Sequence, residues 1–502
     1  MQEPTATNSY EQERRQKLEK LRELGVNPYG QRTEGIAPLA GVKGSYTAEM
    51  GHDAGPVVKV AGRVVLKRDF GKKLSFLTLR DETGDLQIAL DAKRLPELDW
   101  GVRDLLDLGD IVVAEGPLGT TKTGEVTVWC THVGMASKSL LTPPAKYEGL
   151  SDVEQRYRQR YVDLWANPEV MQTLKMRMKI VEEIRAYMKG LGYVEVETPM
   201  MQPLAGGAAA RPFETHHNAL DIPLYMRIAP ELYLKRLLVG GFSKIFELNR
   251  NFRNEGISPR HNPEFTMLEA YEAYGSWKTM ADMVEGMICH LAEKLLGGLR
   301  VVHKKVTTEG TESTEKVINL QRPWRRVRMT ELVKERTGWE FNQQLLSETQ
   351  KGELRGKNPG KDLKLNGSPA EQLVEVYEKI IEHTLVDPCF VTHVPSVIIP
   401  LARPAGDDPF FADVYELAIN GQEISPGYTE LNDPDVQAKQ FGTQVGDEAE
   451  KQKIDHDFLN ALKYGMPPAG GMGMGIDRLV MMLTGAESIR DVILFPLMKP
   501  QD

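Results

Sequence analysis

The spacing of hydrophobic positions changes along the chain, and each spacing predicts a different type of element. In residues 10–24, Leu18 and Leu21 lie on one stripe among dense mixed charges. Gly25 and then Pro28 follow, so the pattern predicts a helix that stops at this glycine. We interpret this helix as packing on its own protein, and a basic helix face that contacts RNA is the alternative.

Short runs rich in β-branched residues follow from Val57 to about Leu141. The turn sequences ETGD and KTGE separate some of them, and about five strands at this spacing predict a small barrel of the oligonucleotide-binding (OB) type. The Pro-Pro stretch that follows predicts a linker. Beyond it, helical stretches and strands are mixed without an internal repeat. We therefore predict an α+β protein with an N-terminal barrel and a larger second domain.

The segment 244–274 shows the most informative alternation. Phe246 and Phe252 fall on one parity and polar residues on the other, which predicts a half-buried strand on which Arg253 and Glu255 share a face. The loop GISPRHNP follows. A second strand then places four residues on one parity, namely Phe265, Met267, Glu269 and Tyr271.

Antiparallel pairing of these two strands would bring an arginine, several carboxylates and two aromatic rings onto one surface. An arginine fork suits a phosphate or a carboxylate, an aromatic face suits a purine, and a carboxylate suits an amine. The alternative interpretation is an ordinary charged face of a sheet.

A glycine-rich strand near the C-terminus is a second candidate. Gly471, Gly473 and Gly475 alternate on one face, which leaves that face without side chains and lets a flat ligand lie on the backbone. Arg478 follows at a predicted helix start, where the helix dipole and the guanidinium both favour an anion. Ile476 excludes the dinucleotide fingerprint, and a strand that uses glycine for packing is the alternative.

A predicted hairpin supplies a third candidate. Its turn is Asn420-Gly421, so Ala418 should face Glu423. Glu416 then lies on the same face as Glu423, one diagonal away. Two carboxylates a diagonal apart can share a magnesium ion that carries phosphate oxygens. Exposed strand carboxylates in water are the alternative.

Length and composition limit the class of protein. The 502 residues allow about three domains or fewer, each with its own core. Hydrophobic residues make up 41% and charged residues 26% of the chain, which fits neither a disordered nor a fibrous protein. The chain has no long apolar stretch and its first residues lack the apolar segment of a signal peptide, so we expect no membrane partner and no secretion.

Charge and cysteine usage narrow the picture further. The formal net charge of −9 excludes a generic nucleic-acid coat, so any nucleic-acid contact must be local. Cys130, Cys289 and Cys389 are odd in number and far apart, which excludes a disulfide framework and a zinc site. We expect a cytoplasmic protein.

The chain resembles a known family. Three segments resemble motifs 1, 2 and 3 of the class II aminoacyl-tRNA synthetases, namely GYVEVETPMM (192–201), FRNEGISPRHNPEFTMLEAY (252–271) and GMGMGIDR (471–478). Two more, GGAAARPFETHHNALD (206–221) and APELYLKRLLVGGF (229–242), resemble the bacterial type of class II lysyl-tRNA synthetase. The similarity runs from about residue 10 to the C-terminus and is specific, because several long motifs occur in the family order.

This resemblance implies ATP-dependent attachment of lysine to tRNA(Lys) in two steps, through a lysyl-adenylate and with release of pyrophosphate. It also implies magnesium as cofactor, a homodimer with Pro199 in its interface, and a barrel that reads the anticodon. The implied domains are a helical extension (1–55), the OB-fold anticodon-binding domain (56–141), a linker (142–155) and a class II catalytic domain (156–502), an antiparallel sheet flanked by helices with insertions near 304–317 and 345–370.

The resemblance also assigns roles to single residues. The implied catalytic residues are Arg253 and Arg478. The implied ATP-binding residues are Arg253, Glu255, His261, Asn262, Phe265, Glu416, Glu423, Gly475 and Arg478, of which Glu416 and Glu423 bind the metal. The implied amino-acid-binding residues are Gly207, Glu231, Arg253, Glu269, Tyr271, Tyr428 and Glu430. The implied anticodon-binding residues are Arg68, Phe76, Gln87 and Glu125.

Two positions depart from the family pattern. Pro426 stands where the family usually has Asn, and Ile399 stands where Ser usually precedes Pro-Leu. Because Pro426 has neither an N–H nor a side-chain donor, a contact from that Asn to the substrate carboxylate is absent. The acidic pocket residues remain, so lysine is the expected substrate. A same-subclass synthetase with altered amino-acid specificity and a catalytically inactive RNA-binding paralogue are the alternatives.

Overall fold

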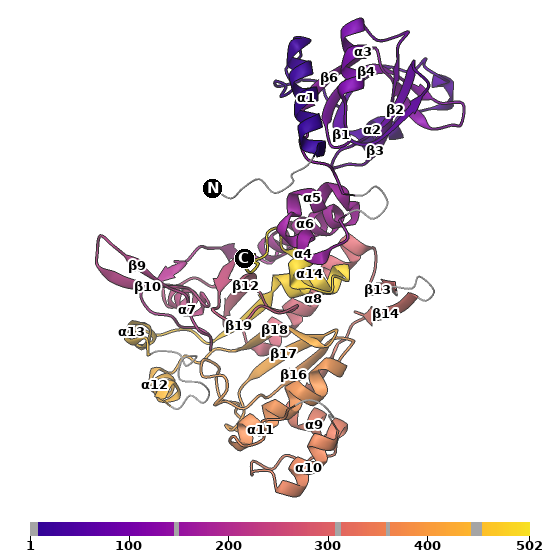
Figure 1. Ribbon diagram of the computed structural model, residues 1–502. Coiled ribbons are helices and arrows are strands. Elements are labelled where there is room, and N and C mark those ends of the chain that lie inside the picture. Colours follow the sequence, from indigo (N-terminus) through magenta and orange to yellow (C-terminus); the bar gives the residue numbers. More distant parts are fainter. Residues whose placement is uncertain (1–8, 145–149, 307–312, 358–361, 443–453, 502) are drawn as a thin grey trace. The chain divides into compact units, whose positions relative to one another are not determined.

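The computed structural model of the chain describes residues 9–144, 150–306, 313–357, 362–442 and 454–501. The chain forms two compact units, Met1–Gln172 and Thr173–Asp502, which we describe one at a time (Figure 1). Within the described ranges, none of the helices has both the length and the apolar character needed to cross a membrane.

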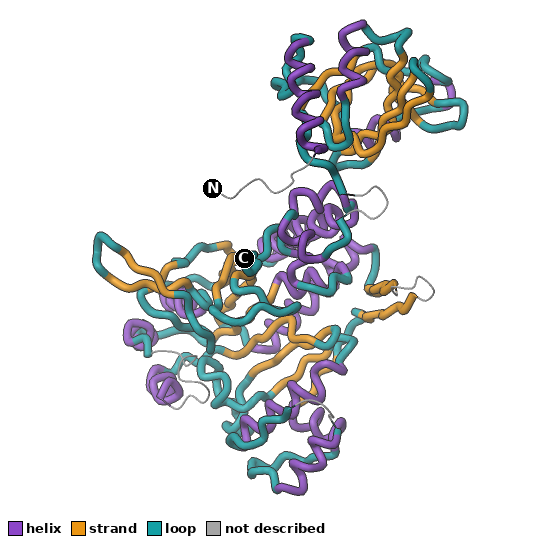
Figure 2. The backbone as a smooth tube through the Cα atoms, viewed as in Figure 1, coloured by secondary structure: helices purple, strands orange, loops and turns teal. Residues whose placement is uncertain are grey.

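The first unit contains a six-stranded sheet in the order β1-β2-β3-β5-β4-β6, and β1 also pairs with β4, which closes a barrel (Figures 1 and 2). Half-buried and buried residues alternate along β2, because one face of the strand packs on the barrel core. The predicted OB-type barrel is confirmed. Its strands are β1 (Val57–Phe70), β2 (Leu74–Arg80), β3 (Asp85–Asp91), β4 (Ile111–Thr120), β5 (Val126–Trp129) and β6 (His132–Ser137).

The N-terminal helix α1 (Ser9–Glu23) packs on this barrel. Leu18 and Leu21 are buried, and Leu21 belongs to the barrel core. Arg14 donates hydrogen bonds of 3.0 and 2.9 Å to the backbone carbonyls of Ser139 and Leu141. The interpretation of this segment as a helix that packs on its own protein is confirmed. The other helices of this unit are α2 (Leu39–Gly44), α3 (Glu97–Leu105), α4 (Val153–Arg158) and α5 (Arg160–Ala166).

The second unit is built on an eight-stranded sheet in the order β15-β16-β17-β18-β19-β12-β11-β7 (Figure 2). Neighbouring strands are antiparallel except at the two edges, where β15–β16 and β11–β7 are parallel. Two distant parts of the sequence therefore meet in the centre, where β19 lies between β18 and β12. The strands are β7 (Val194–Glu195), β11 (Lys244–Phe252), β12 (Glu264–Ala273), β15 (Arg325–Arg328), β16 (Cys389–Thr392), β17 (Val414–Ile419), β18 (Gln422–Thr429) and β19 (Ala469–Gly475).

Helices cover one face of this sheet. Phe246, Leu268 and Met472, on neighbouring strands, belong to one apolar cluster with buried residues of α6 (Pro168–Gly190), α8 (Trp277–Leu296) and α14 (Ile476–Thr484). Because side chains alternate along a strand, the polar residues between these positions point to the opposite face. That face carries the candidate site.

Further helices pack beside the two halves of the sheet. One group surrounds β15 to β17 and consists of α9 (Met329–Thr337), α10 (Glu348–Gly356), α11 (Pro369–Val376), η2 (Tyr377–Ile381) and η3 (Glu382–Thr384). The other group consists of α7 (Glu231–Val239), α12 (Pro434–Gly442) and α13 (His456–Lys463). A short helix, α15 (Ile489–Val492), follows α14.

The remaining strands form two small sheets. β8 (Met201–Gln202), β9 (Glu214–His217) and β10 (Ile222–Met226) form one, in the order β8-β10-β9. β13 (Arg300–Val306) and β14 (Ser313–Asn319) form the other and contain most of the predicted insertion 304–317; residues 307–312 lie outside the described residues. The predicted insertion 345–370 is not only surface, because Leu354, Leu363 and Leu365 join the core beneath β15 to β17.

Candidate active site

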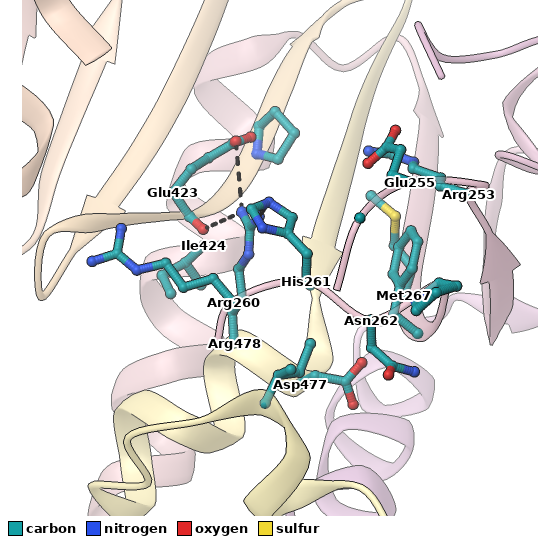
Figure 3. A pocket seen from close by; sticks show the side chains of 16 residues that line it. Arg253, Glu255, Arg260, His261, Asn262, Met267, Glu423, Ile424, Asp477 and Arg478 are labelled. Carbon is teal, nitrogen blue, oxygen red and sulfur yellow. Dashed lines mark hydrogen bonds and ion pairs between the residues drawn. The ribbon is translucent and has the colours of Figure 1, made fainter. Parts of the chain in front are cut away.

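A cavity of about 170 Å³ opens on the polar face of the large sheet (Figure 3). Its walls come from the loop between β11 and β12, from β12, β18 and β19, and from the start of α14. Glu416, a predicted ATP ligand, is not among the lining residues. The other eight predicted ATP-binding residues all line the cavity: Arg253, Glu255, His261, Asn262, Phe265, Glu423, Gly475 and Arg478.

The two strands that begin this site pair antiparallel, as predicted, with Asn251 opposite Phe265. However, β11 ends at Phe252, so the prediction that Arg253 and Glu255 share a strand face is wrong. The Arg253 N–H still bonds to the Pro263 carbonyl (2.8 Å), but the Glu255 N–H bonds back to the Arg253 carbonyl (2.9 Å), and this tight turn breaks the alternation. Both side chains reach the cavity from the loop instead.

Arg253 is a cation without a full set of partners. Its Nε atom is buried and has no hydrogen-bond partner, and the guanidinium carbon lies 5.2 Å from the ring centroid of Phe265. Burial lowers the pKa of Arg253, and the charges of Glu255 and Glu423 counter that effect only in part. Because an arginine remains charged in proteins, this desolvated guanidinium favours an anionic ligand beside the Phe265 ring.

Arg478 faces the cavity from the first turn of α14, as predicted. Its Nη1 donates to the backbone carbonyl of Glu423 (3.0 Å) and lies 3.8 Å from the Glu423 carboxylate, and its Nη2 lies 3.2 Å from His261 Nε2 (Figure 3). Burial and the charge of Arg478 lower the pKa of His261. A neutral His261 can therefore accept from Arg478 while its Nδ1 bonds to Ser258 Oγ (2.8 Å). The two side chains support each other in the wall of the cavity.

The predicted hairpin is present, and Ala418 pairs with Glu423 as expected. A β-bulge between Leu417 and Ala418 then shifts the register, so that Glu416 pairs with Pro426. The simple diagonal relation between Glu416 and Glu423 is therefore wrong, because a bulge inserts one residue into a strand. Even so, the charge of Glu423 contributes to the pKa of Glu416, which burial raises well above its usual range.

Two further carboxylates face this hairpin from the preceding helical turns. Glu382 accepts a hydrogen bond from the backbone N–H of Glu423 (2.9 Å), and the charges of Glu378 and Glu382 both raise the pKa of Glu416. Hard oxygen ligands of this kind suit magnesium. In the described residues no three or more ligating side chains converge on one point. The donor set therefore fits an ion that takes some of its ligands from phosphate.

A second cluster of predicted site residues, which we call the acidic pocket, lies further along the same strands. On β12, Met267 lines the cavity, and Glu269 follows it by two residues. On β18, Pro426 lines the cavity, and Tyr428 follows it by two residues. Residues two apart on a strand share a face and are about 7 Å apart. The predicted amino-acid-binding residues Glu269 and Tyr428 thus lie next to residues of the cavity wall, on the same face of the sheet.

Buried acidic groups dominate this second pocket. Glu231, Glu269 and Glu430 are 5%, 4% and 1% exposed. The Tyr271 hydroxyl donates to Glu269 (3.1 Å), and the Tyr428 hydroxyl donates to Glu231 (2.6 Å). Burial, together with the charge of Glu231, raises the pKa of Glu269 to about 8. The Oε1 atom of Glu430 is buried without a hydrogen-bond partner. Such a set of acceptors favours a cationic ligand.

Glycines make room for these side chains. A Cβ on Gly471 would lie 1.9 Å from Glu430 Oε1 and 2.6 Å from the Tyr271 ring, and a Cβ on Gly473 would lie 2.5 Å from the Met267 methyl carbon. The prediction that a flat ligand lies along all three glycines is therefore wrong, because side chains occupy the space over Gly471 and Gly473. Gly475 alone of the three lines the cavity. Gly207 has a φ of +89°, and a Cβ added to it would lie 3.2 Å from Glu231 Cβ.

Sequence reasoning missed several residues of the site. Lys235 is fully buried and forms ion pairs with Glu231 and Glu430. Arg227 is also buried, and its guanidinium pairs with Glu247 at 2.6 Å. A signal for Lys235 exists in the sequence, because it follows Glu231 by four residues on one helix face. Glu378 and Glu382 carry no such signal, since the fold alone brings them to β18.

The barrel carries three of the four predicted anticodon-binding residues on neighbouring strands, and the fourth, Glu125, directly precedes β5. Arg68 pairs with Phe76 across β1 and β2. Gln87, on β3, donates to Thr127 of β5 (2.8 Å), and Glu125 lies two residues before Thr127. Phe76 is half-buried, and the Phe70 and Trp129 rings lie 5.4 and 6.0 Å from it, edge to face. Such an aromatic group on an OB sheet suits stacking of a nucleobase.

Glu125 forms an ion pair with Lys43, at 3.3 Å. Among the described residues, the other three have no ion-pair partner. The side chains of Glu125 and Lys43 are both about half exposed, so the pair is weak and can exchange for a ligand.

Comparisons with known proteins agree with this arrangement. Residues 152–499 match the family described as tRNA synthetases class II (D, K and N), and residues 58–135 match the OB-fold nucleic acid binding domain. Over 493 residues the chain is 46% identical to a lysine–tRNA ligase of Carboxydothermus hydrogenoformans, with 97% of this chain and 98% of the relative covered.

Two other relatives have the same name. A lysine–tRNA ligase of Pelotomaculum thermopropionicum is 46% identical, with 97% of this chain and 94% of the relative covered. One of Staphylococcus saprophyticus is 44% identical, with 98% and 99% covered. With an OB barrel, a class II sheet and full-length similarity of this degree, the chain belongs to the class II tRNA synthetases and, within them, to the lysine–tRNA ligases.

Proposed function

We propose that this chain joins lysine to tRNA(Lys) in two steps, at the expense of ATP. The observation that supports this most is the buried acidic pocket of Glu231, Glu269 and Glu430, next to β12 and β18, two strands that also line the cavity with Arg253. Lysine carries two ammonium groups and one carboxylate. The pocket suits the first two, and the guanidinium of Arg253, whose Nε has no hydrogen-bond partner, suits the carboxylate.

In the first step a lysine carboxylate oxygen attacks the α-phosphorus of ATP in line, and the bond to pyrophosphate breaks. Lysyl-adenylate and pyrophosphate are the products, and no protein nucleophile takes part. Arg253 is placed to hold both anions during attack, while Phe265 stacks on the adenine and Arg478 contacts the nucleotide from α14. The work of the protein is positioning and stabilisation of charge.

We further propose that Glu416 and Glu423 hold magnesium on the ATP phosphates, while Glu255, His261, Asn262 and Gly475 shape the rest of the nucleotide site. Magnesium would neutralise charge on the pyrophosphate that leaves. The charge of Glu423 acts on the buried carboxyl of Glu416, which supports a role for the two as neighbouring ligands.

The acidic pocket also supports the choice of amino acid. Gly207, Tyr271 and Tyr428 complete its walls around the three glutamates. The negative charge that attracts lysine repels aspartate, the substrate of a related synthetase, so one feature serves both affinity and exclusion.

In the second step a ribose hydroxyl at the tRNA end attacks the activated carbonyl, which releases AMP. We propose that the barrel selects the tRNA by its anticodon. The Phe76 ring would stack on a base, and Arg68, Gln87 and Glu125 would contact base edges or backbone. Their placement on β1, β2, β3 and the start of β5 supports this proposal.

We also propose a homodimer that works in the cytoplasm. A groove of about 850 Å³ between α6 and the C-terminal segment is lined largely by apolar residues, and Met178, Phe495 and Leu497 beside it are 47%, 70% and 55% exposed. Exposed apolar surface of this kind suits a subunit interface. The three cysteines are buried and unpaired, which suits a reducing compartment.

The test is ATP–pyrophosphate exchange with each of the twenty amino acids in turn, with magnesium present. Exchange with lysine alone is the expected result. Exchange with a different amino acid would indicate altered specificity in spite of the acidic pocket. No exchange with any amino acid would indicate an inactive RNA-binding paralogue.

A further inference from the structure

Lys235 lies on α7 behind the acidic pocket and has no exposed surface. Its ammonium lies 2.8 Å from Glu231 Oε1, forms a close ion pair with Glu430 Oε2 and donates to the backbone carbonyl of Leu401 at 3.2 Å. An ammonium has three hydrogens to donate. The ammonium is thus surrounded by three oxygen atoms of the protein.

The two glutamates that Lys235 contacts come from different elements. Glu231 begins α7, and Glu430 follows directly after β18. Lys235 joins them, and the Tyr428 hydroxyl adds a second donor to Glu231 Oε1. Because Glu430 Oε2 is held by Lys235, Glu430 Oε1 is the oxygen left without a partner, in the space that Gly471 leaves open.

The charge of the pocket follows from the groups that face it. Glu231, Glu269 and Glu430 would bring three negative charges, and Lys235 brings one positive charge, which leaves −2. Arg227 and Glu247 form a neutral pair next to Glu269. Tyr271 and Tyr428 remain neutral, because burial raises the pKa of each well above its usual range. When all three carboxyls are ionised, as a bound cation favours, this net charge of −2 matches the two ammonium groups of lysine.

We propose that Lys235 is a positioning residue for the amino acid, which holds the carboxyl groups of Glu231 and Glu430 in place and leaves Glu430 Oε1 free to accept from the substrate ammonium. This inference rests on the proposed function, since it concerns how that pocket is prepared for lysine.

The protonation states support this geometry. Burial acts to lower the pKa of Lys235, but the charges of Glu231 and Glu430 outweigh it, so the pKa is raised and the ammonium stays charged. Burial raises the pKa of Glu430 to about 8 although Lys235 opposes that rise, so a bound substrate ammonium would favour its ionised form. Without the ammonium, three buried carboxylates would face one another, and protons would replace it.

The experiment compares Lys235→Met with the parent protein by ATP–pyrophosphate exchange at several pH values between 6 and 8.5. We expect the KM for lysine to rise by about tenfold or more while the KM for ATP stays within about twofold. The rise should be largest at low pH and shrink as pH increases, because the carboxylates regain their charge only at higher pH.

Lys244→Met is the matched control. Lys244 also pairs with a glutamate, Glu272 at 2.9 Å, but on the outer part of β11 and away from the pocket. Its removal should leave the KM for lysine and its pH profile unchanged. Equal effects of the two substitutions would overturn the proposal, and so would a Lys235→Met protein that melts at a lower temperature but keeps the parent KM for lysine.

If the Lys235→Met protein does not fold, Lys235→Arg is tested instead, because this substitution keeps the positive charge but moves it to a different position. The KM for lysine should then rise by a similar factor at every pH, with the parent pH profile. An unchanged KM would overturn the positioning role. The parent protein tests the proposed function, because absence of lysine-dependent exchange in the parent would contradict that function. The variants test only the role of Lys235.

Discussion

At the scale of single residues, the site is defined by polar groups that the protein leaves without partners. Arg253 Nε and Glu430 Oε1 are both buried and unpartnered, one a donor and the other an acceptor. Each such group costs about 1–3 kcal/mol while it stays unsatisfied. A ligand that brings an anion to the first and a cation to the second recovers both costs, and an amino acid does so within one molecule.

Arg253→Ala should lower the rate of adenylate formation by about 10²–10³-fold, because a preorganised donor to developing charge is lost. ATP–pyrophosphate exchange measures this, and a thermal melt within about 2 °C of the parent shows that the fold is intact. Arg250→Ala is the control, since Arg250 is on the adjacent part of β11 and pairs loosely with Glu264. Near-normal exchange by the Arg253 variant would remove this residue from the mechanism.

The raised pKa of Glu269 predicts that lysine binding releases a proton. With a pKa of about 8, this carboxyl is mostly protonated at pH 7 in the free protein, and a bound ammonium favours its ionised form. We expect lysine affinity to rise between pH 6 and pH 8. Calorimetric titration with lysine in two buffers of different ionisation enthalpy gives the number of protons released on binding. If this number does not fall above pH 8.5, the proton does not come from Glu269.

Pro426→Asn should lower the KM for lysine in the exchange assay. Pro426 lines the cavity and brings its ring to 3.9 Å from the position of a Cβ on Gly473. An amide there would add a donor that proline lacks, within reach of the substrate carboxylate. The KM for ATP serves as the internal control and should not change. An unchanged KM for lysine would mean that other residues already satisfy that carboxylate.

At the scale of elements, the regular spacing of residues along neighbouring strands sets the distance between the two proposed substrate sites. Residues two apart on β12 and β18 separate the cavity from the acidic pocket, which we propose as the nucleotide site and the amino-acid site. The barrel uses its strands in the same way for a different ligand. A change on the barrel should therefore affect only the step that involves tRNA.

Phe76→Ala should weaken the charging of tRNA and leave adenylate formation intact. Loss of a stacking ring costs about 1–3 kcal/mol per base, which corresponds to a KM for tRNA higher by about 5- to 150-fold. Aminoacylation and pyrophosphate exchange are measured on the same preparation. Equal damage to both activities would point instead to a misfolded protein.

The sequence predicted elements better than it predicted their irregularities. Alternation of apolar residues was enough for the pairing of β11 with β12, and Asn420-Gly421 was enough for the β17–β18 turn, because both depend on local rules. The bulge beside Leu417 could not be predicted, since it depends on packing between strands. Lys235 was missed because a buried lysine makes sense only once Glu430, almost 200 residues later, is placed beside it.

At the scale of the whole molecule, the exposed apolar groove beside α6 leads to a prediction about assembly. Phe495→Glu should shift the protein toward a monomer, because a buried charge at a subunit interface is unfavourable. Sedimentation velocity at several concentrations measures the change. Tyr464→Glu is the control, since Tyr464 is 83% exposed but does not line this groove. Identical sedimentation of both variants and the parent would locate the interface elsewhere.

The position of β19 has a consequence for how the protein is made. This strand is encoded near the end of the chain, yet it fills the gap between β12 and β18 in the middle of the sheet. Until the ribosome has released residues 469–475, two half-sheets with open hydrogen-bonding edges are exposed, and such edges promote association between nascent chains. A premature stop codon just before residue 469, although it removes less than a tenth of the chain, would therefore produce an aggregation-prone chain rather than a shortened enzyme.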